Sequence, residues 1–258
     1  MRRIFIPGLV AAVAVTGLSA PANAHPSSDP VLAENALYST GPIPRAKCAE
    51  KPIRRKNHFP TAKAYVEVVA GCLDRVWAKQ LGKAKFRFKK PKFRLLAKNP
   101  IWDCDLKWEK QWSYGYCADN RTITIVLDKR LTGRTPGDLS LFTLVATLYS
   151  EHVQYLAGIE KAWVRALPDS EDLGAEETED EIIRRLYQQS LCFAAAFTGS
   201  VYASMPRKSA DWKAAVAKRS KERHWGSPED TTYWMNGGFT TRDLADCNTW
   251  RAENSLVD

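Results

Sequence analysis

The sequence predicts a single α+β domain that is mainly helical, contains a small β-sheet and is stabilised by disulfides. Three observations predict it. Long stretches have apolar residues at helical spacing, two short stretches have strand patterns, and six cysteines follow an N-terminus typical of export. The composition nowhere changes enough to mark a second domain, so one domain is expected.

The N-terminus is typical of a secretory signal peptide spanning residues 1–24. Two arginines precede an apolar stretch from Ile4 to Leu18, and Ala22-Asn23-Ala24 is a small-x-small cleavage sequence. The stretch is shorter and more interrupted than the roughly 20 apolar residues that span a bilayer, which argues against a membrane anchor. We therefore expect a secreted, extracellular protein with no transmembrane segment after cleavage, exported by the general or the twin-arginine route.

Removal of the signal peptide would leave 234 residues with a net charge of +7, because residues 1–24 contain two arginines and no acids. That length is enough for one domain with a substantial core. Residues 25–37 are polar and carry prolines, so we expect a flexible N-terminal arm there. The domain itself is expected to span 38–258.

Helices are predicted where apolar residues recur every three or four positions. This pattern covers 65–79 and 141–156, and for the second helix Asp138 is the expected N-cap and Gly158 the expected end. A further helix should run from the acidic cluster at 176–181 to about residue 200, because carboxylates are favourable at a helix N-terminus. Another is expected over 210–223.

Two strands are predicted between the first two helices. Residues 122–127 are β-branched and apolar, which is typical of a buried strand. Residues 83–88 alternate between basic and apolar side chains, which predicts a half-buried strand. Its basic side contains Lys83, Lys85 and Arg87, and its apolar side contains Ala84, Phe86 and Phe88.

The six cysteines predict three disulfides, because an even number in an exported chain is typical of a disulfide framework. Six cysteines allow 15 pairings. Local spacing favours Cys48–Cys72 and Cys104–Cys117, which leaves Cys192–Cys247. A cysteine zinc site is the alternative, but the chain has no Cys-x-x-Cys pair. A catalytic thiol would leave an odd number of cysteines.

Several motifs spread over the chain resemble the neutral zinc metallopeptidases of bacteria, an exported group with a zincin-like core. Their order and spacing over some 200 residues carry the resemblance. It implies a zincin-like fold, and a zinc ion in the active relatives. The matching segments include Cys72-Leu73-Asp74-Arg75-Val76-Trp77, Tyr116-Cys117-Ala118-Asp119-Asn120, His152-Val153-Gln154-Tyr155-Leu156, Cys192-Phe193-Ala194, Trp234 with Gly238-Phe239, and Cys247-Asn248-Thr249-Trp250.

The departures from this family coincide with its active site. The family carries H-E-Y-G-H before His-Val-Gln, where two histidines bind zinc and the glutamate activates water. Aligned on His152, the chain has Thr147 at the first zinc histidine, Leu148 at the catalytic glutamate and Glu151 at the second histidine. On the later helix, Tyr187 stands at the third ligand and Leu191 at a nearby aspartate.

These substitutions predict a pseudopeptidase that holds no metal cofactor and has no catalytic residues. A zinc site needs about three protein ligands, and threonine and tyrosine are poor ones. A leucine cannot act as a general base. Leu148 and Leu191 replace two carboxylates with apolar groups, which is consistent with a former site that has closed into core, because unpaired buried carboxylates are costly.

An alternative is a hydrolase with a rebuilt metal site, using Glu151, His224 and an acid such as Glu181. Adjacent helix positions point about 100° apart, so Glu151 and His152 would rarely bind one metal. We expect structural hydrogen bonding for His152 and His224. The sequence contains no Gly-x-Ser-x-Gly elbow and no P-loop that could replace the lost chemistry.

Basic residues are concentrated over 79–94, where no acid occurs. A solvated surface is the ordinary explanation for such a run. The functional alternative is a polyanion-binding module that uses Lys83, Lys85, Arg87 and Lys89. The expected partners are therefore an extracellular protein, a peptide or an anionic cell-wall polymer, and no specific nucleic acid.

Overall fold

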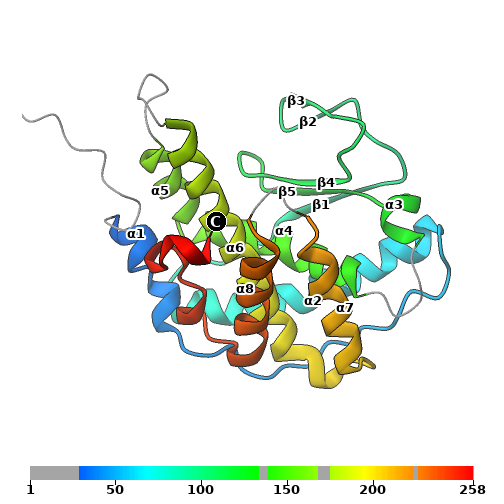
Figure 1. Ribbon diagram of the computed structural model, residues 1–258. Helices are drawn as coiled ribbons and strands as arrows, with labels where there is room; N and C mark the ends of the chain where they lie inside the picture. The colour runs from blue at the N-terminus through cyan, green and yellow to red at the C-terminus, as the bar shows by residue number, and fades with distance from the viewer. Residues whose placement is uncertain (1–28, 134–138, 168–174, 223–225, 258) are drawn as a thin grey trace, which may run out of the picture.

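The computed structural model of this protein describes residues 29–133, 139–167, 175–222 and 226–257 (Figure 1). The predicted signal peptide, the expected cap Asp138 and His224 lie outside these residues. Among the residues described, no helix is long and apolar enough to cross a bilayer.

The protein is α+β and 58% helical, as predicted. Two long helices, α2 and α6, and the buried helix α4 form most of the core. The α-helices are α1 (Pro30–Ala33), α2 (Phe59–Lys83), α3 (Lys129–Thr132), α4 (Ser140–Leu156), α5 (Ile159–Ala166), α6 (Ala175–Val201), α7 (Ser209–Arg219) and α8 (Pro228–Thr241). Short 3-10 helices are η2 (Ala36–Ser39), η3 (Tyr202–Ser204), η5 (Ala245–Cys247), η6 (Thr249–Arg251) and η7 (Asn254–Leu256).

The main sheet has the strand order β1-β5-β4, so β1 and β4 are its edge strands. Strand β5 (Thr122–Val126) confirms the strand expected at 122–127 and pairs parallel with β1 (Lys92–Leu96) and antiparallel with β4 (Tyr114–Cys117). A separate hairpin, β2 (Trp102–Asp103) and β3 (Leu106–Lys107), lies on the side of this sheet away from the helices (Figure 1).

The prediction of a strand over 83–88 is wrong. Helix α2 continues to Lys83, Lys85 has a positive φ of 61°, and the strand begins only at Lys92. The alternation itself is real, because Lys85 and Arg87 are exposed while Phe86 packs against the core. Alternation determines which side chains are buried, but a strand also needs a neighbouring strand to pair with, and no described strand pairs with residues 84–91.

Helix α4 lies at the centre of the core. It packs against α2 and α6, and α6 packs against α8. Glycine 158, with φ 78°, follows the helix and confirms the expected end, because the left-handed conformation suits glycine. Helix α7 ends at Arg219, earlier than the 210–223 range predicted.

The prediction of a flexible arm over 25–37 is wrong for residues 29–37, which are the part of that range that the structure describes. Leu32 and Leu37 are fully buried, and the side chain of Asn35 donates to the carbonyl of Ala157 at 3.1 Å. The apolar residues among the polar ones supply this burial, and the Asp29 side chain caps the first turn of α1. The packed domain therefore includes residues from Asp29 onward.

All three predicted disulfides are present, and no described cysteine is free. Cys48–Cys72 joins an N-terminal loop to α2, Cys104–Cys117 joins the β2–β3 turn to β4, and Cys192–Cys247 joins α6 to η5. Each bond links an irregular or short segment to a longer element. Cys192–Cys247 closes the longest loop, with a sequence separation of 55, and is expected to restrict the unfolded chain most.

Candidate functional site

Helices α4 and α6 carry the positions at which the resemblance places a metal site. Thr147 and Leu148 are buried on α4, and Leu191 is buried on α6. Both leucines belong to the hydrophobic core. The Thr147 hydroxyl donates to the Thr143 carbonyl, one helical turn earlier, at 2.9 Å. These three side chains therefore serve packing and local hydrogen bonding.

The side chain of Arg219, at the end of α7, lies against Tyr187. Arg219 Nη1 donates to the Tyr187 hydroxyl at 3.4 Å and to Glu222 Oε2 at 2.5 Å, and the guanidinium also interacts with the Tyr114 hydroxyl. Arg219 is buried. Burial opposes its charge, but Tyr187, Glu222 and Tyr114 together raise its pKa above the usual value. We call Tyr114, Glu151, Tyr187, Arg219 and Glu222 the Arg219 cluster.

Glu151 belongs to this cluster electrostatically. Burial raises the pKa of its carboxyl to about 8, Arg219 acts to lower that pKa, and Glu160 raises it further. Burial likewise raises the pKa of Glu160 to about 7, with a contribution from Asp119. At neutral pH the Glu151 carboxyl is therefore mostly protonated and is a weak ligand for a cation, whereas the Glu160 carboxyl is about half protonated.

The residues of the Arg219 cluster do not fit a zinc ion. Zinc requires neutral histidine, thiolate or carboxylate ligands in a tetrahedral arrangement. Tyr187 instead accepts from a guanidinium, and burial raises its pKa above the usual value, so its phenolate is strongly disfavoured. The buried cation of Arg219 would repel a second one. We derive no metal chemistry at this position.

His152 holds the sheet against α4. Its Nε2 lies 2.6 Å from the Lys89 carbonyl and its Nδ1 lies 2.9 Å from the Tyr116 hydroxyl. A carbonyl only accepts, so Nε2 carries the proton and Nδ1 accepts from the tyrosine. Burial lowers the pKa of His152, which favours this neutral form. The structural hydrogen bonding expected for this residue is confirmed.

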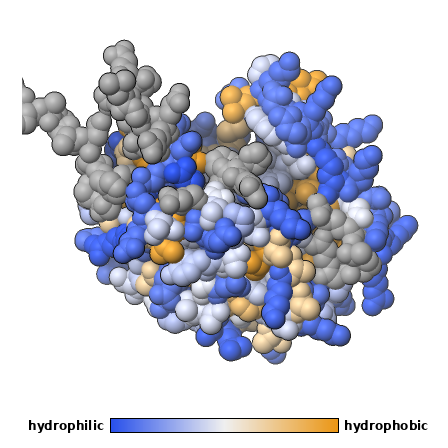
Figure 2. All heavy atoms as spheres, viewed as in Figure 1, coloured by the Kyte–Doolittle hydropathy of each residue, from blue (hydrophilic) through white to orange (hydrophobic). Residues whose placement is uncertain are grey.

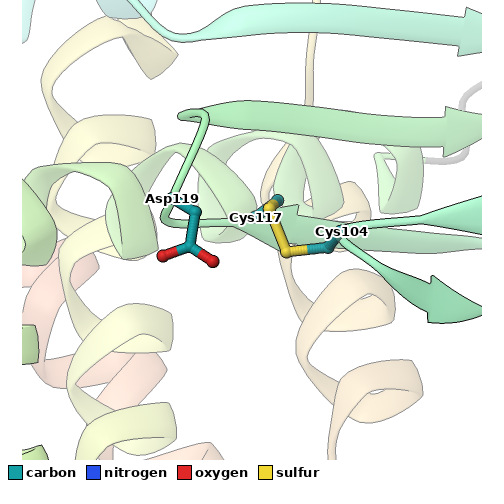
Figure 3. Close-up of side chains that lie close together, drawn as sticks. All are labelled: Cys104, Cys117 and Asp119. Atoms are coloured by element: carbon teal, nitrogen blue, oxygen red, sulfur yellow. A yellow bond between two sulfur atoms is a disulfide. The ribbon is translucent and has the colours of Figure 1, made fainter.

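One group of potential metal ligands occurs in the described part of the chain, at Cys104, Cys117 and Asp119. Figure 3 shows the Asp119 carboxylate in the turn beside the bonded sulfurs. Because both sulfurs are joined in a disulfide, only the carboxylate could bind an ion. The Glu181 of the alternative site forms an ion pair with Arg185 at 2.7 Å, and His224 lies outside the described residues.

A groove of about 730 Å³ runs beside β4, between this edge strand and the loop that follows β3. Its volume is in the range of ordinary ligand sites. Tyr114 lines the groove and also belongs to the Arg219 cluster, so the groove adjoins that cluster. The remaining lining is mostly aromatic or small: Leu106, Trp108, Trp112, Gly115, Tyr116 and the Cys104–Cys117 disulfide, with Asp103, Gln111 and Ser113.

The four lysine and arginine positions proposed for polyanion binding are all exposed. Lys83 ends α2 and donates to the Thr40 carbonyl at 3.3 Å. Lys85 lies in the turn after the helix, with a φ of 61°, and Arg87 and Lys89 follow in an irregular segment that leads to the edge strand β1. Charges on an edge strand also prevent association with other sheets, so exposure alone does not assign a function.

Arg219 and its partners were missed by the sequence reasoning, although a signal was present. Trp212, Ala215, Val216 and Arg219 share one helical face by their spacing. Three of them are apolar, and an arginine on an apolar face indicates a buried cation with partners. The partners lie on β4 and α6, and helix periodicity contains no information about them.

Comparison with known proteins found no matching family model, curated protein or solved structure.

Replacement of Glu151 by glutamine should stabilise the protein at alkaline pH. A carboxyl whose pKa is raised from its usual value near 4.5 to about 8 contributes stability below pH 4.5 and loses it as the pH rises through 8. Glutamine resembles the protonated form. We expect Glu151→Gln to match the wild type at pH 5 and to gain about 2 kcal/mol at pH 9, because partial exposure screens the full shift.

Urea unfolding at both pH values measures this difference. Glu67→Gln is the matched control, because Glu67 is 59% exposed on α2. The control should follow the wild type at both values. A Glu151→Gln protein that also follows the wild type at pH 9 would show that folding does not raise the pKa of this carboxyl.

Proposed function

We propose that this protein is a secreted, non-catalytic relative of the bacterial neutral zinc metallopeptidases, with a zincin-like core, which acts by binding a peptide or protein outside the cell. The Arg219 cluster carries the proposal. A buried guanidinium contacts the tyrosine that stands at the third ligand position, while Leu148, at the position of the catalytic base, is core. In this proposal, the guanidinium of Arg219 supplies positive charge at the position where the active relatives hold zinc.

The groove beside β4 supports peptide binding as the activity that remains. Val126 donates its N–H to the Ser113 carbonyl at 2.7 Å, which places Tyr114 and Tyr116 at the positions of the ladder that do not bond to β5. Their backbone N–H and C=O groups therefore point toward the open edge. An extended peptide could pair with these groups and place apolar side chains in the aromatic groove.

Metal content and peptidase activity test the non-catalytic half of the proposal. We expect the purified protein to hold less than one zinc per chain, to cleave no peptide, and to gain almost nothing in melting temperature from added zinc, because only a ligand of the folded state stabilises it. Chelator-sensitive proteolysis with one zinc per chain would contradict the proposal. It would indicate ligands recruited elsewhere, with His224 the first to examine.

Peptide selection against a blocked groove tests the binding half. A Cβ atom added at Gly115 would meet nothing within 4 Å, so Gly115→Arg introduces a long side chain into the groove without a backbone clash. Gly82→Arg is the control, because Gly82 is equally open and does not line the groove. Peptides selected for binding to the wild type should bind the Gly82→Arg control but should no longer bind the Gly115→Arg variant. Equal binding by both variants would place the site elsewhere.

A further inference from the structure

The positive charge of this protein comes from one segment. Residues 83–112 contain ten lysines and arginines and three acids, a net charge of +7. All of this net charge lies in 83–94, which leads into the sheet beside the hairpin, because 95–112 contain three lysines and three acids. The predicted mature chain also carries +7, so the rest of it has a net charge of zero. Any anionic partner bound by long-range attraction would therefore approach this segment.

The same segment exposes most of the large apolar side chains at the surface. Seven such residues are exposed in the described part of the chain, and four of them lie within 101–112. Ile101 is 75% exposed, Trp102 59%, Leu106 61% and Trp112 40%. Figure 2 shows hydrophobic residues among hydrophilic ones where Figure 1 places β2 and β3. Apolar groups exposed together mark an interaction surface.

The β2–β3 hairpin is held in place by a disulfide and an ion pair to the main sheet. The Cys104–Cys117 disulfide ties its turn to β4, and Arg94 Nη1 donates to Asp103 Oδ1 at 2.8 Å. Trp108 is buried beneath it and donates its Nε1–H to the Trp112 carbonyl at 3.2 Å. The exposed apolar groups are thus presented by a preorganised element, which lowers the entropy lost on binding.

We propose that the β2–β3 hairpin docks the protein on an anionic phospholipid membrane. The apolar side chains of the hairpin would enter the boundary between headgroups and acyl chains, where tryptophan is favoured. The exposed Lys98, Lys107 and Lys110 would contact the phosphates around it. Because Asp103, Asp105 and Glu109 balance these three lysines, the seven basic residues of 83–94 would supply the net attraction to the anionic surface.

The aliphatic residues favour a membrane over a soluble polyanion. A soluble polyanion binds through charge and aromatic stacking, and exposed Ile101 and Leu106 would add nothing to either. In a membrane both side chains leave water. An acidic protein surface is the second alternative, and the experiment below separates all three.

Vesicle flotation with the full-length mature protein tests the proposal. Binding is expected to phosphatidylcholine vesicles that contain phosphatidylglycerol and not to phosphatidylcholine alone. The double variant Trp102→Ser, Leu106→Ser should bind about tenfold more weakly or worse, because two exposed apolar groups lose their transfer into the interface. Val68→Ser with Val164→Ser is the matched control, since these residues are 44% and 51% exposed and lie elsewhere.

A charge variant tests the second half of the contact. Lys98→Glu, Lys107→Glu and Lys110→Glu together should abolish flotation, because each lysine near an anionic surface contributes about fivefold. The control is a triple variant with the same change in net charge at exposed sites outside the segment, and it should weaken binding far less. Its substitutions are Lys51→Glu, Lys56→Glu and Lys213→Glu. Brominated lipids should quench the fluorescence of the wild type more than that of Trp102→Phe.

Three results would overturn the proposal. Absence of flotation with anionic vesicles is the first. Flotation that the Trp102→Ser, Leu106→Ser variant retains in full, and that heparin abolishes, would indicate a polyanion site. If an added acidic protein abolishes flotation, and brominated lipids do not quench the tryptophan fluorescence, the surface would bind an acidic protein instead of a membrane. Leu106 and Trp112 line the groove as well as the docking surface. Gly115→Arg should nevertheless float like the wild type, which separates loss of peptide binding from loss of membrane docking.

Discussion

Replacement of Arg219 by methionine is expected to lower the free energy of unfolding by about 3 kcal/mol. Methionine keeps much of the volume but removes the hydrogen bonds to Tyr187 and Glu222, and hydrogen bonds to charged groups contribute about 1.5–3 kcal/mol each. The loss stays below the largest values for buried ion pairs because Glu222 is 38% exposed and can reach water.

The loss should also depend on pH. Arg219 lowers the pKa of Glu151, so its removal raises that pKa above about 8. A folded-state pKa that is raised further makes the folded protein lose more stability as the pH rises through it. We therefore expect Arg219→Met to be more destabilising at pH 9 than at pH 5.

Urea unfolding at the two pH values measures both effects. Lys213→Met removes an exposed charge from the same helix and should change stability by less than about 0.5 kcal/mol. Arg219→Lys keeps a charge but not the planar group, and should fall between the wild type and Arg219→Met. An equal loss at both pH values would mean that Arg219 and Glu151 are not coupled.

Replacement of Gly238 by alanine is expected to cost about 3 kcal/mol or more. A Cβ atom at this position would lie 2.3 Å from the Cys192 carbonyl oxygen, which belongs to the backbone of α6. Backbone cannot move aside as a flexible side chain can, so α6 and α8 would have to separate and the surrounding core would loosen. Thermal unfolding should show a clear fall in melting temperature.

The neighbouring Gly237 offers a matched control on the same helix. A Cβ atom there would meet nothing within 4 Å. Gly237→Ala should therefore be neutral or stabilising by up to about 1 kcal/mol, because alanine has the higher helix propensity. If both substitutions had the same effect, the close approach of α6 and α8 would not exist in solution.

Patterns local in sequence predicted the parts of the fold that depend on local physics. The spacing of apolar residues over 141–156 has the period of a helix, the β-branched composition of 122–127 favours a strand, and both elements form. The cysteine spacing predicted three pairs that the structure contains. The alternation over 83–88 misled because it describes burial, and Lys85 leads into a segment without a strand partner.

The sequence by itself determined the helical character of the protein and its disulfides, and the resemblance pointed to Thr147, Leu148, Glu151, Tyr187 and Leu191 as the positions of a candidate site. Only the tertiary structure decided what surrounds those positions. Arg219 on α7 meets Tyr187 on α6 and Tyr114 on β4 because three segments that are distant along the chain pack together. Likewise, the exposed hairpin and the basic segment become one surface only in three dimensions. Periodicity reports the face on which a side chain lies, whereas its partner depends on how the elements pack.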